Sequence, residues 1–283
     1  MSDITVVTTF HQAGLDLYGQ RFLDSFSQNV ETKIKLLVYA ENCTPVIDPE
    51  CKNITVFDSF EALPKLNEFK AKWGSVPHAN GDISAHPARR GRKDWNKAFK
   101  WDAVRFANKV YAVFDACTRS KDWCVWMDAD TFVHSPWKHK DFAKLLPEDK
   151  WITYVGRGKG SQTWPECGFY GMNMKHPVCI EFLKEFERMY EDADNGIFTL
   201  EEWHDSFVFG HILNGMKKDC PHVHDYSENI YVNTAKTGGG GHPLINSDLG
   251  KWIDHMKGGR KDSGKSLAKD LMNKRPESYW NEV

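Results

Sequence analysis

Short runs of apolar residues alternate along the chain with segments in which apolar residues recur every three or four positions. The first run, residues 4–10, is rich in β-branched side chains and predicts a buried strand. A helix is predicted next from apolar residues at helical spacing, Leu15, Tyr18, Phe22 and Phe26. Two further strands are predicted at residues 33–40 and 54–57. This strand–helix–strand order predicts an α/β layer structure with parallel strands.

The middle of the chain begins with a segment that carries few signals of regular structure. Residues 74–93 mix Gly, Pro, Asn and His and predict a long surface loop. A long amphipathic helix is predicted from Trp95, and its apolar face is formed by Phe99, Ala103, Phe106, Val110, Val113 and Cys117. This helix leads to a predicted strand at residues 123–127.

The alternation continues in the last part of the chain. Strands are predicted at residues 151–155 and 168–173. The sequence Thr199-Leu200-Glu201-Glu202 has the form of a capping box and predicts a helix that runs to Leu213. With 283 residues, 41% of them hydrophobic, the chain can bury the core of one large domain with a C-terminal extension.

The strand at residues 123–127 is followed by two aspartates separated by one residue, Asp128-Ala129-Asp130. In an extended chain successive side chains alternate between faces, so both carboxylates would point the same way. Carboxylates that converge at the end of a strand suit Mg²⁺ or Mn²⁺, and such an ion can hold a diphosphate. The pattern is a first indication of an enzyme that acts on a sugar nucleotide.

The spacing alone is weak evidence, because a chain of this length contains about one Asp-x-Asp by chance. A second copy, Asp192-Ala193-Asp194, serves as an internal control. It follows a helix-like stretch and leads into Asn195-Gly196, which is a turn signal. We therefore interpret the second copy as a solvated helix end, since only the first copy follows a buried strand.

Charge and cysteine usage limit the classes of protein that fit. The net charge of −2 gives no general electrostatic attraction to nucleic acid or to an acidic membrane. The seven cysteines include no Cys-x-x-Cys pair, so we expect buried reduced thiols and a cytoplasmic setting. No apolar run is long enough to span a bilayer, and no signal peptide is evident at the N-terminus.

A second chemically informative cluster lies late in the chain, Asp254-His255-Met256-Lys257-Gly258-Gly259-Arg260-Lys261. It contains His-x-x-Gly-x-x-Lys, a pattern that occurs by chance in about one chain in twenty of this length. A neutral imidazole can complete a site begun by carboxylates, glycines let the backbone approach phosphate oxygens, and a lysine adds positive charge. Taken together, the two clusters predict one metal–diphosphate site.

The N-terminal strand, the strand that ends in Asp-x-Asp and the late His-x-x-Gly-x-x-Lys resemble those of GT-A fold glycosyltransferases. Among these, the chain is most similar to the glycogenin-like and bacterial galactosyltransferase-like (family 8) enzymes. The resemblance implies a Rossmann-like fold with a mixed, mostly parallel central sheet flanked by helices. It implies that Asp128, Asp130 and His255 bind Mn²⁺ (or Mg²⁺), which grips the diphosphate of a UDP-sugar. It also implies that Gly258 and Lys261 lie at the diphosphate.

Other donor-binding candidates lie near the ends of the first and fourth predicted strands. Thr8, Thr9 and Phe10 end the first strand, where similar enzymes bind the nucleobase and ribose. The alternative for these three residues is an ordinary buried strand end. Ala129, between the two aspartates, is also placed at the donor.

The remaining candidates are charged residues on predicted helices and loops. Arg105 and Lys109 share a helix face, where a basic residue reaches the donor in similar enzymes; the alternative is a solvated charge pair. Asp205 stands where such enzymes place an acidic residue near the acceptor and the reacting sugar, although the helix dipole would also favour it there. Glu166 precedes a strand that lines the acceptor site in such folds, and its alternative is an exposed loop carboxylate.

The implied function is metal-dependent transfer of a sugar from a nucleoside diphosphate sugar to a hydroxyl acceptor, with retention of anomeric configuration. If the enzyme inverts instead, a carboxylate must act as general base, and Asp205 or Glu166 is the first choice. Two other functions stay open. One is a haloacid-dehalogenase-type phosphatase, whose nucleophile also lies in an Asp-x-Asp, and the other is a non-catalytic nucleotide- or carbohydrate-binding protein.

The domain limits and the acceptor complete the expectations from sequence. We expect a transferase domain at residues 1–261, with a nucleotide-sugar half at 1–135 and an acceptor half at 136–261. Residues 262–283 are expected to form a C-terminal helical tail. A glycan, a protein side chain, a small metabolite or a hydroxymethylated DNA base could be the acceptor. The basic, aromatic segment at residues 89–100 keeps the DNA alternative open.

Overall fold

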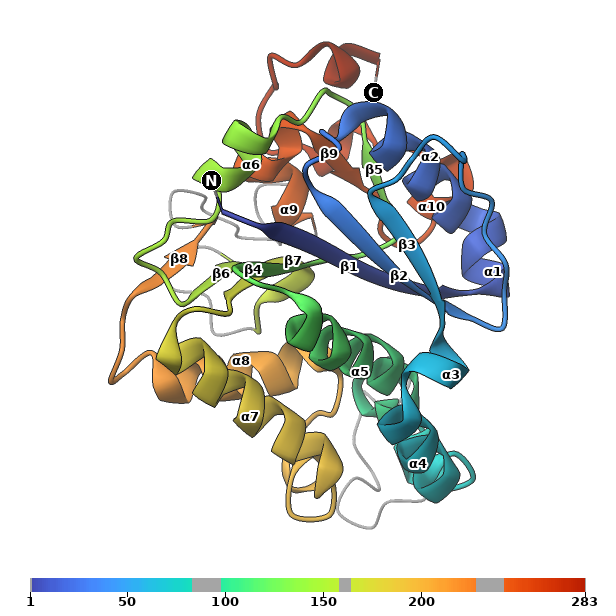
Figure 1. Ribbon diagram of the computed structural model, residues 1–283, viewed down its shortest axis with the longest axis vertical. Coiled ribbons are helices and arrows are strands. Elements are labelled where there is room, and N and C mark those ends of the chain that lie inside the picture. Colours follow the sequence, from blue (N-terminus) through green and yellow to red (C-terminus); the bar gives the residue numbers. More distant parts are fainter. Residues whose placement is uncertain (1, 83–97, 158–163, 228–241, 283) are drawn as a thin grey trace.

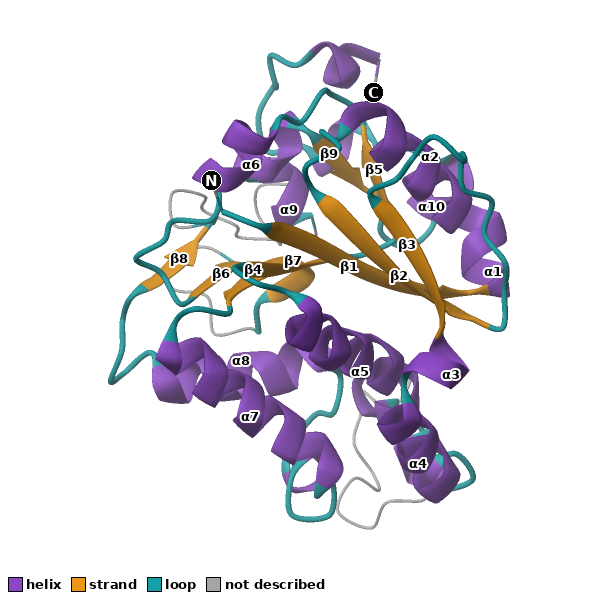
Figure 2. Cartoon of the chain, in the orientation of Figure 1, coloured by secondary structure: helices purple, strands orange, loops and turns teal. Residues whose placement is uncertain are grey.

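The computed structural model describes residues 2–82, 98–157, 164–227 and 242–282. These residues form a seven-stranded central sheet with helices packed on both faces (Figures 1 and 2). The strands are β1 (Ile4–His11), β2 (Lys35–Glu41), β3 (Ile54–Asp58), β4 (Trp123–Met127), β5 (Thr131–Val133), β6 (Ile152–Val155), β7 (Glu166–Asn173), β8 (Val223–Asp225) and β9 (Ile253–His255). The strands predicted from sequence are confirmed as β1, β2, β3, β4, β6 and β7.

The helices differ widely in length. The α-helices are α1 (Gln12–Gly14), α2 (Gln20–Asn29), α3 (Ser59–Ala62), α4 (Pro64–Trp73), α5 (Ala103–Arg119), α6 (His139–Lys144), α7 (Pro177–Glu191), α8 (Asp205–Met216), α9 (Pro243–Asn246) and α10 (Arg260–Ser263). A π-helix, Leu15–Gly19, joins α1 to α2. Short 3₁₀ helices lie at Pro77–Ala79, Ala98–Trp101, Ile197–Thr199, Asp248–Lys251, Ala268–Asp270 and Ser278–Glu282.

The central sheet is mixed and mostly parallel, as expected. Its strand order is β3-β2-β1-β4-β7-β6-β8. The four strands from β3 to β4 are parallel, whereas β7 is antiparallel to both β4 and β6. Because β7 runs against β4, its first residues lie at the same edge of the sheet as the residues that follow β4.

The central strands are apolar throughout because each face of the sheet is covered. Val7 and Trp126 belong to the core between the sheet and α4, α5, α7 and α8. Their chain neighbours Val6 and Val125 belong to the core on the other face, with α2 and α6. Successive side chains of a strand point to opposite faces, so a strand buried on both sides has no polar alternation. Figure 1 shows α5 and α7 on one face of the sheet and α2 and α6 on the other.

Two predicted helix starts are wrong, because local capping bonds begin the helices later in the chain. The helix predicted from Trp95 begins at Ala103, since the Asp102 carboxylate accepts the Arg105 N–H at 3.1 Å. Residue 95 lies outside the described residues, and Phe99 is on a 3₁₀ helix with 44% of its surface exposed.

The helix predicted from the capping box at Thr199 begins at Asp205 instead. The His204 imidazole accepts the Phe207 N–H at 3.3 Å and caps the helix. Glu202 cannot complete a capping box, because its carboxylate contacts Lys100 at 2.6 Å and His204 at 3.0 Å. Thr199 closes a 3₁₀ helix, with its Oγ1 donating to the Gly196 carbonyl at 2.7 Å.

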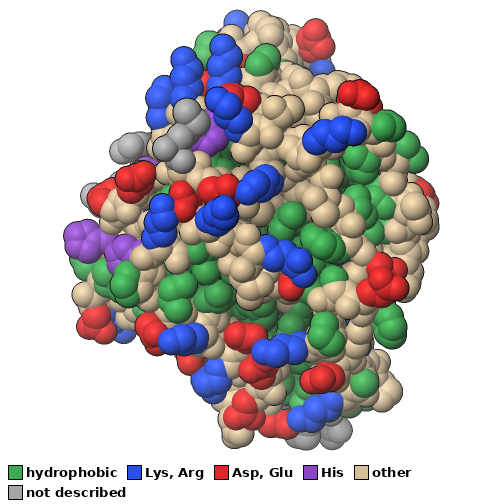
Figure 3. Space-filling view, in the orientation of Figure 1, with side chains coloured by type: hydrophobic (Ala, Val, Ile, Leu, Met, Phe, Trp, Pro, Cys, Tyr) green, Lys and Arg blue, Asp and Glu red, His purple; other side chains and the backbone are tan. Residues whose placement is uncertain are grey.

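Charged side chains of both signs are interspersed over the lower part of the face in Figure 3, and Lys and Arg side chains gather over α6. This mixture accords with the small net charge. Among the described residues, none of the helices combines the length and apolar character that a membrane span requires.

Candidate active site

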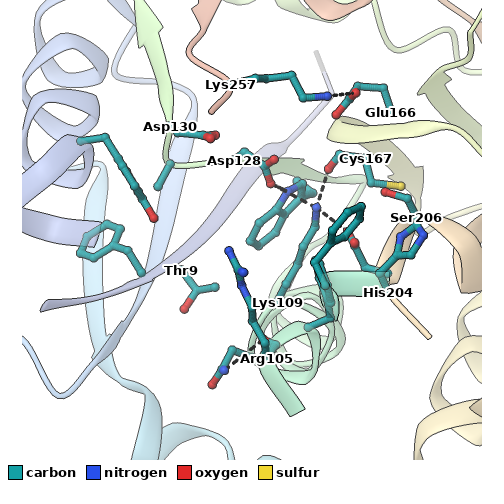
Figure 4. A pocket seen from close by; sticks show the side chains of 18 of the residues that line it. Thr9, Arg105, Lys109, Asp128, Asp130, Glu166, Cys167, His204, Ser206 and Lys257 are labelled. Carbon is teal, nitrogen blue, oxygen red and sulfur yellow. Dashed lines mark hydrogen bonds and ion pairs between the residues drawn. The ribbon is translucent and has the colours of Figure 1, made fainter. Parts of the chain in front are cut away.

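A pocket of about 820 Å³ opens where β1 and β4 end and β7 begins. Its lining also includes residues of α5, the first turn of α8 and the segment that follows β9. Figure 4 shows the labelled side chains from these elements pointing into one space. The edge of an α/β sheet at the carboxyl ends of its parallel strands is the usual position of a ligand site in such sheets.

A two-stranded sheet joins the two sequence clusters at this pocket. β5 pairs antiparallel with β9, and their register sets Thr131 opposite His255. The Met256 N–H also donates to the Asp130 carbonyl at 2.9 Å. As a result, candidate ligand atoms of Asp128, Asp130 and His255 lie within 4.8 Å of one another. The structure brings together the three residues that the resemblance implies as metal ligands.

The two aspartates converge through a turn, and the extended geometry expected from sequence is wrong. β4 ends at Met127, and the Thr131 N–H donates to the Asp128 carbonyl at 3.2 Å. The Thr131 hydroxyl donates to the same carbonyl at 2.8 Å. A turn in place of a strand therefore directs both carboxylates toward His255.

The ligand atoms that this cluster offers fit a divalent cation. The Nε2 atom of His255 lies 3.2 Å from Asp130 Oδ1 and 3.7 Å from Asp128 Oδ2. Asp130 Oδ1 is buried, and apart from this contact with His255 it has no hydrogen-bond partner among the described residues. Burial opposes a charge on His255, but the two carboxylates outweigh it and raise the pKa of the imidazole to about 9. Carboxylate oxygens suit Mn²⁺ and Mg²⁺, and one imidazole nitrogen is compatible with Mn²⁺.

A lysine follows the candidate metal ligands, as the His-x-x-Gly-x-x-Lys pattern predicts. The Lys261 Nζ atom lies 2.8 Å from Asp130 Oδ2 and 4.9 Å from the centroid of the Tyr18 ring. Gly258 has a φ of +57°, a left-handed conformation that glycine adopts without strain, and it permits the turn before Lys261. Lys261 lines the pocket, whereas Gly258 does not.

Lys109 occupies the middle of the pocket wall and bonds to protein groups. Its Nζ atom lies 3.1 Å from Asp128 Oδ1 and 2.7 Å from Asp205 Oδ2, and it donates to the Cys167 carbonyl (Figure 4). Burial opposes its charge, yet Asp128 and Asp205 raise the pKa of Lys109 well above its usual value. Burial also opposes the charge of Asp128, and Lys109 and His255 nevertheless lower the pKa of that carboxyl.

Glu166 is buried at the start of β7, so its interpretation as an exposed loop carboxylate is wrong. Its carboxylate pairs with Lys257, and one of its oxygens lies 3.0 Å from Arg157 Nη2. Burial opposes its charge, but Lys257, His255 and Arg157 outweigh burial and lower the pKa of Glu166 to about 2. The group is therefore a permanently ionised carboxylate at neutral pH.

The candidates at the end of β1 differ in their access to the pocket. Thr9 and Phe10 line it, and the Thr9 hydroxyl donates to the Tyr39 carbonyl at 2.6 Å. Thr8 is fully buried and does not line the pocket, as expected for an ordinary strand residue. Ala129 lines the pocket between the two aspartates.

Arg105 enters the pocket from α5, one turn before Lys109 (Figure 4). Its guanidinium carbon lies 5.8 Å from the centroid of the Phe106 ring. The side chain is exposed, and no ion pair with a carboxylate is found for it among the described residues. Arg105 is accordingly the lining cation best able to meet an incoming anion.

Sequence reasoning missed three residues that shape this site. Trp126 donates its indole N–H to Asp128 Oδ1 at 2.6 Å, and its position two residues before Asp128 could have indicated a shared face. Gly168 lies against His255, where an added Cβ would stand 2.7 Å from the imidazole Cε1 atom. A glycine inside a predicted strand signals such a close approach. Tyr18 was predicted only as one of the apolar residues of a helix, but it lies on the π-helix and lines the pocket.

The second Asp-x-Asp behaves as the internal control predicted. Asp192 follows the last residue of α7 and accepts the Asn195 side-chain N–H at 3.0 Å. Asp194 is 62% exposed and lies 3.3 Å from Lys72. Neither residue lines the pocket.

Most of the basic segment at residues 89–100 lies outside the described residues. At its described end, Lys100 pairs with the buried Glu202 at 2.6 Å. This lysine is directed to a protein carboxylate, and the described part of the segment gives no support to DNA as the acceptor.

No family model matches the chain, and no curated protein matches its sequence. Solved structures with a similar chain path include two glycosyltransferases. The WbbM bifunctional glycosyltransferase is 11% identical with a TM-score of 0.42; the match covers 79% of this chain and 38% of that one. Mouse xyloside xylosyltransferase 1 is 10% identical with a TM-score of 0.40, covering 79% of this chain and 84% of that one. Similarities this low identify neither the catalytic residues nor the substrates of this chain.

Proposed function

We propose that the chain is a metal-dependent glycosyltransferase, which moves a sugar from a nucleoside diphosphate sugar to a hydroxyl group. One observation carries the proposal. Two carboxylates, an imidazole and a lysine from segments far apart in the sequence meet at one end of a large pocket. Such a set offers a cation site and an adjacent positive side chain, which together match the charge of a diphosphate.

In this proposal Asp128, Asp130 and His255 hold Mn²⁺ or Mg²⁺. The ion would supply Lewis acidity, neutralising charge that develops on the departing diphosphate. Lys261 is held beside Asp130 at 2.8 Å and adds its own positive charge at the same place. Arg105 extends into the pocket on the opposite wall, where it can meet the remaining phosphate oxygens (Figure 4).

The nucleoside is proposed to lie against the end of β1. Thr9 and Phe10 line the pocket there, and Tyr18 stands beside Lys261. An aromatic wall and a polar strand end suit a base and a ribose, respectively. By the resemblance found in the sequence, uridine is the proposed nucleoside.

The arrangement of the two candidate bases favours retention of anomeric configuration. Asp205 is held by Lys109 at 2.7 Å, and Glu166 by Lys257 and Arg157. A carboxylate whose pKa is lowered to about 2, as that of Glu166 is, is a weak base near neutral pH. We therefore propose that Asp205 and Glu166 orient the acceptor and the transferred sugar. An inverted product, identified by NMR of the anomeric proton, would contradict retention.

A panel of nucleotide sugars tests the proposed activity. Release of UDP from UDP-glucose, UDP-galactose, UDP-xylose and their N-acetylated relatives is measured with and without Mn²⁺, in wild type and in Asp130→Asn. The proposal predicts metal-dependent release from at least one donor and its loss in the variant. Binding of UDP without turnover of any donor would instead indicate a non-catalytic protein. Phosphate release from p-nitrophenyl phosphate would indicate the phosphatase.

A further inference from the structure

A second hollow of about 410 Å³ lies on the outer face of α8, next to the pocket described above. We call it the α8 groove, and it is lined by Trp164, Phe207, Gly210, His211, Asn214, Gly215 and Lys218. Its helix residues are spaced three or four positions apart, so they form one stripe along α8. Trp164 also lines the main pocket, which makes the two hollows continuous across one indole ring.

Two glycines shape the groove in different ways. A Cβ added at Gly215 would meet no atom within 4 Å, whereas one added at Gly210 would stand 2.7 Å from Pro165 Cδ. Gly210 thus allows the Trp164-Pro165 segment to pack closely against α8, and Gly215 leaves space at the far end. A glycine within a helix lowers stability by about 1 kcal/mol relative to alanine. Helix stability alone therefore does not account for the two glycines that line the groove.

The position of α8 links this groove to the reacting end of the pocket. Asp205 and Ser206, in the first turn of α8, line the main pocket, and Asn214 lies in the groove. At the helical rise per residue, Ser206 and Asn214 are about 12 Å apart along the axis. A ligand that spans both hollows must therefore be longer than one sugar ring.

The groove has the side chains that bind carbohydrates. Trp164 and Phe207 present aromatic rings, which suit the apolar faces of sugar rings. Asn214, His211 and Lys218 are exposed and offer amide, imidazole and ammonium groups to hydroxyls. Among the described residues, the lining includes no carboxylate. Beside Trp164 lie the His204 ring, at a centroid distance of 4.7 Å, and the Lys100 ammonium, 5.1 Å from the indole centroid.

We propose that the α8 groove is an acceptor subsite for a glycan of at least two sugar units. Resting on the proposed transferase function, this inference names the acceptor class. The terminal unit would lie in the main pocket near Asp205, and the next units would pass over Trp164 into the groove. A protein acceptor is the competing occupant, and a peptide array serves to detect it.

The experiment uses the full chain, loaded with Mn²⁺ and UDP, on an array of neutral and acidic glycans of one to six units. Gly215→Trp fills the groove, because its Cβ has open space in which to extend. Lys217→Ala is the matched control, since Lys217 is the neighbour of Lys218 and lies outside the groove. The Mn²⁺-dependent thermal shift by UDP verifies that each variant is folded.

The expected result is binding to glycans of two or more units that is stronger than binding to their single units. Gly215→Trp should weaken binding of the longer glycans about tenfold or more, and Lys217→Ala should leave it unchanged. Equal binding by wild type and Gly215→Trp, or binding to peptides and to no glycan, would overturn the subsite. If the subsite fails in this way while the wild type still turns over a nucleotide sugar, the proposed transferase function is unaffected. Absence of UDP binding would count against the proposed function itself.

Discussion

The ammonium group of Lys109 lies 2.7 Å from the carboxylate of Asp205, inside the pocket wall. The same ammonium group lies 3.1 Å from Asp128, so one side chain of α5 connects the turn that begins at Asp128 to the first turn of α8. Both the lysine and Asp205 are almost inaccessible to water. The lysine is therefore a structural bridge between the turn that follows β4 and the first turn of α8.

Replacement of Lys109 should show how much this bridge contributes. In Lys109→Met, Asp128 and Asp205 lose a common partner, and breaking a buried ion pair costs about 3 kcal/mol or more. We expect the free energy of unfolding in urea to fall by about that amount, and UDP release from the donor to fall with it.

A surface lysine with the same connectivity provides the control for this variant. Lys65 also contacts two carboxylates, Glu187 at 2.7 Å and Glu191, but 54% of its side chain is exposed. Exposed pairs contribute about 1 kcal/mol or less, so Lys65→Met should be nearly neutral. Equal losses of stability in the two variants would contradict the bridging role of Lys109.

Gly168 should prove necessary for the position of His255. In Gly168→Ala the new methyl group would stand 2.7 Å from the imidazole Cε1 atom, so the ring must shift from the position in which its Nε2 atom faces Asp130. Gly171→Ala on the same strand is equally crowded, with Leu146 at 2.7 Å, but lies away from the pocket. We expect both variants to be destabilised and only Gly168→Ala to lose affinity for Mn²⁺ by calorimetric titration. Loss of Mn²⁺ affinity in both variants would show that crowding acts through the fold as a whole.

The C-terminal residues should stabilise the strand that carries His255. The carboxylate of Asp254, fully buried on β9, accepts bonds from the Ser266 hydroxyl at 2.5 Å and the Tyr279 hydroxyl at 2.8 Å. Tyr279→Phe leaves a buried carboxylate oxygen with one partner fewer, which costs about 1–3 kcal/mol. Tyr190→Phe is the control, because the buried Tyr190 hydroxyl has no hydrogen-bond partner among the described residues. Urea denaturation should separate the two variants, and equal stabilities would refute the role of the Tyr279 bond.

His134 should make stability depend on pH in mildly acidic solution. Burial lowers the pKa of its imidazole to about 4, although a bond to the Gly250 backbone and the charges of Asp254 and Glu277 oppose the shift. In the unfolded chain the ring takes up a proton near pH 6.5, so the unfolded state binds more protons between these values. The contribution of neutral His134 is complete above pH 6.5 and is lost as the pH falls toward 4.

His134→Phe isolates this effect, because the other titrating groups are retained. Between pH 6.5 and 4 the unfolding free energy of wild type should fall more than that of the variant, by at most about 3 kcal/mol. Stacking on Tyr279, whose ring centroid is 4.2 Å away, can be kept by the phenyl ring. Parallel pH profiles for the two proteins would show that His134 does not titrate as proposed.

The strands could be predicted because burial on both faces leaves an unbroken apolar run, which is visible in one segment of sequence. Helix starts were harder to predict. The apolar spacing from Trp95 did not reveal that Asp102 caps α5, and the capping-box pattern at Thr199 drew attention away from His204, which caps α8. The convergence of Asp128, Asp130 and His255 could be predicted because the two sequence clusters that contain them each carry a recognisable spacing. The turn at Asp128 was not predicted, because the apolar run before it indicates only a strand, whereas the turn is made by two bonds from Thr131 to the Asp128 carbonyl.

The environment of the candidate site residues depends on contacts that sequence does not reveal. Lys109 was expected to reach the donor but bonds to Asp128 and Asp205, which come from different elements. Glu166 is buried because Lys257, from the segment after β9, supplies a counter-charge. In both cases the partner is distant along the chain, so no local pattern could indicate whether the charge is exposed.

The most direct test of the account is calorimetric titration of UDP into wild type, Asp130→Asn and Asp194→Asn, with and without Mn²⁺. Asp130 and Asp194 are the last aspartates of the two Asp-x-Asp copies, and of these two only Asp130 lines the pocket and lies beside His255. We predict that Mn²⁺ strengthens UDP binding in wild type and in Asp194→Asn, and that this effect is lost in Asp130→Asn. Equal Mn²⁺-dependent binding by all three proteins would contradict the assignment of Asp128, Asp130 and His255 as the metal–diphosphate site.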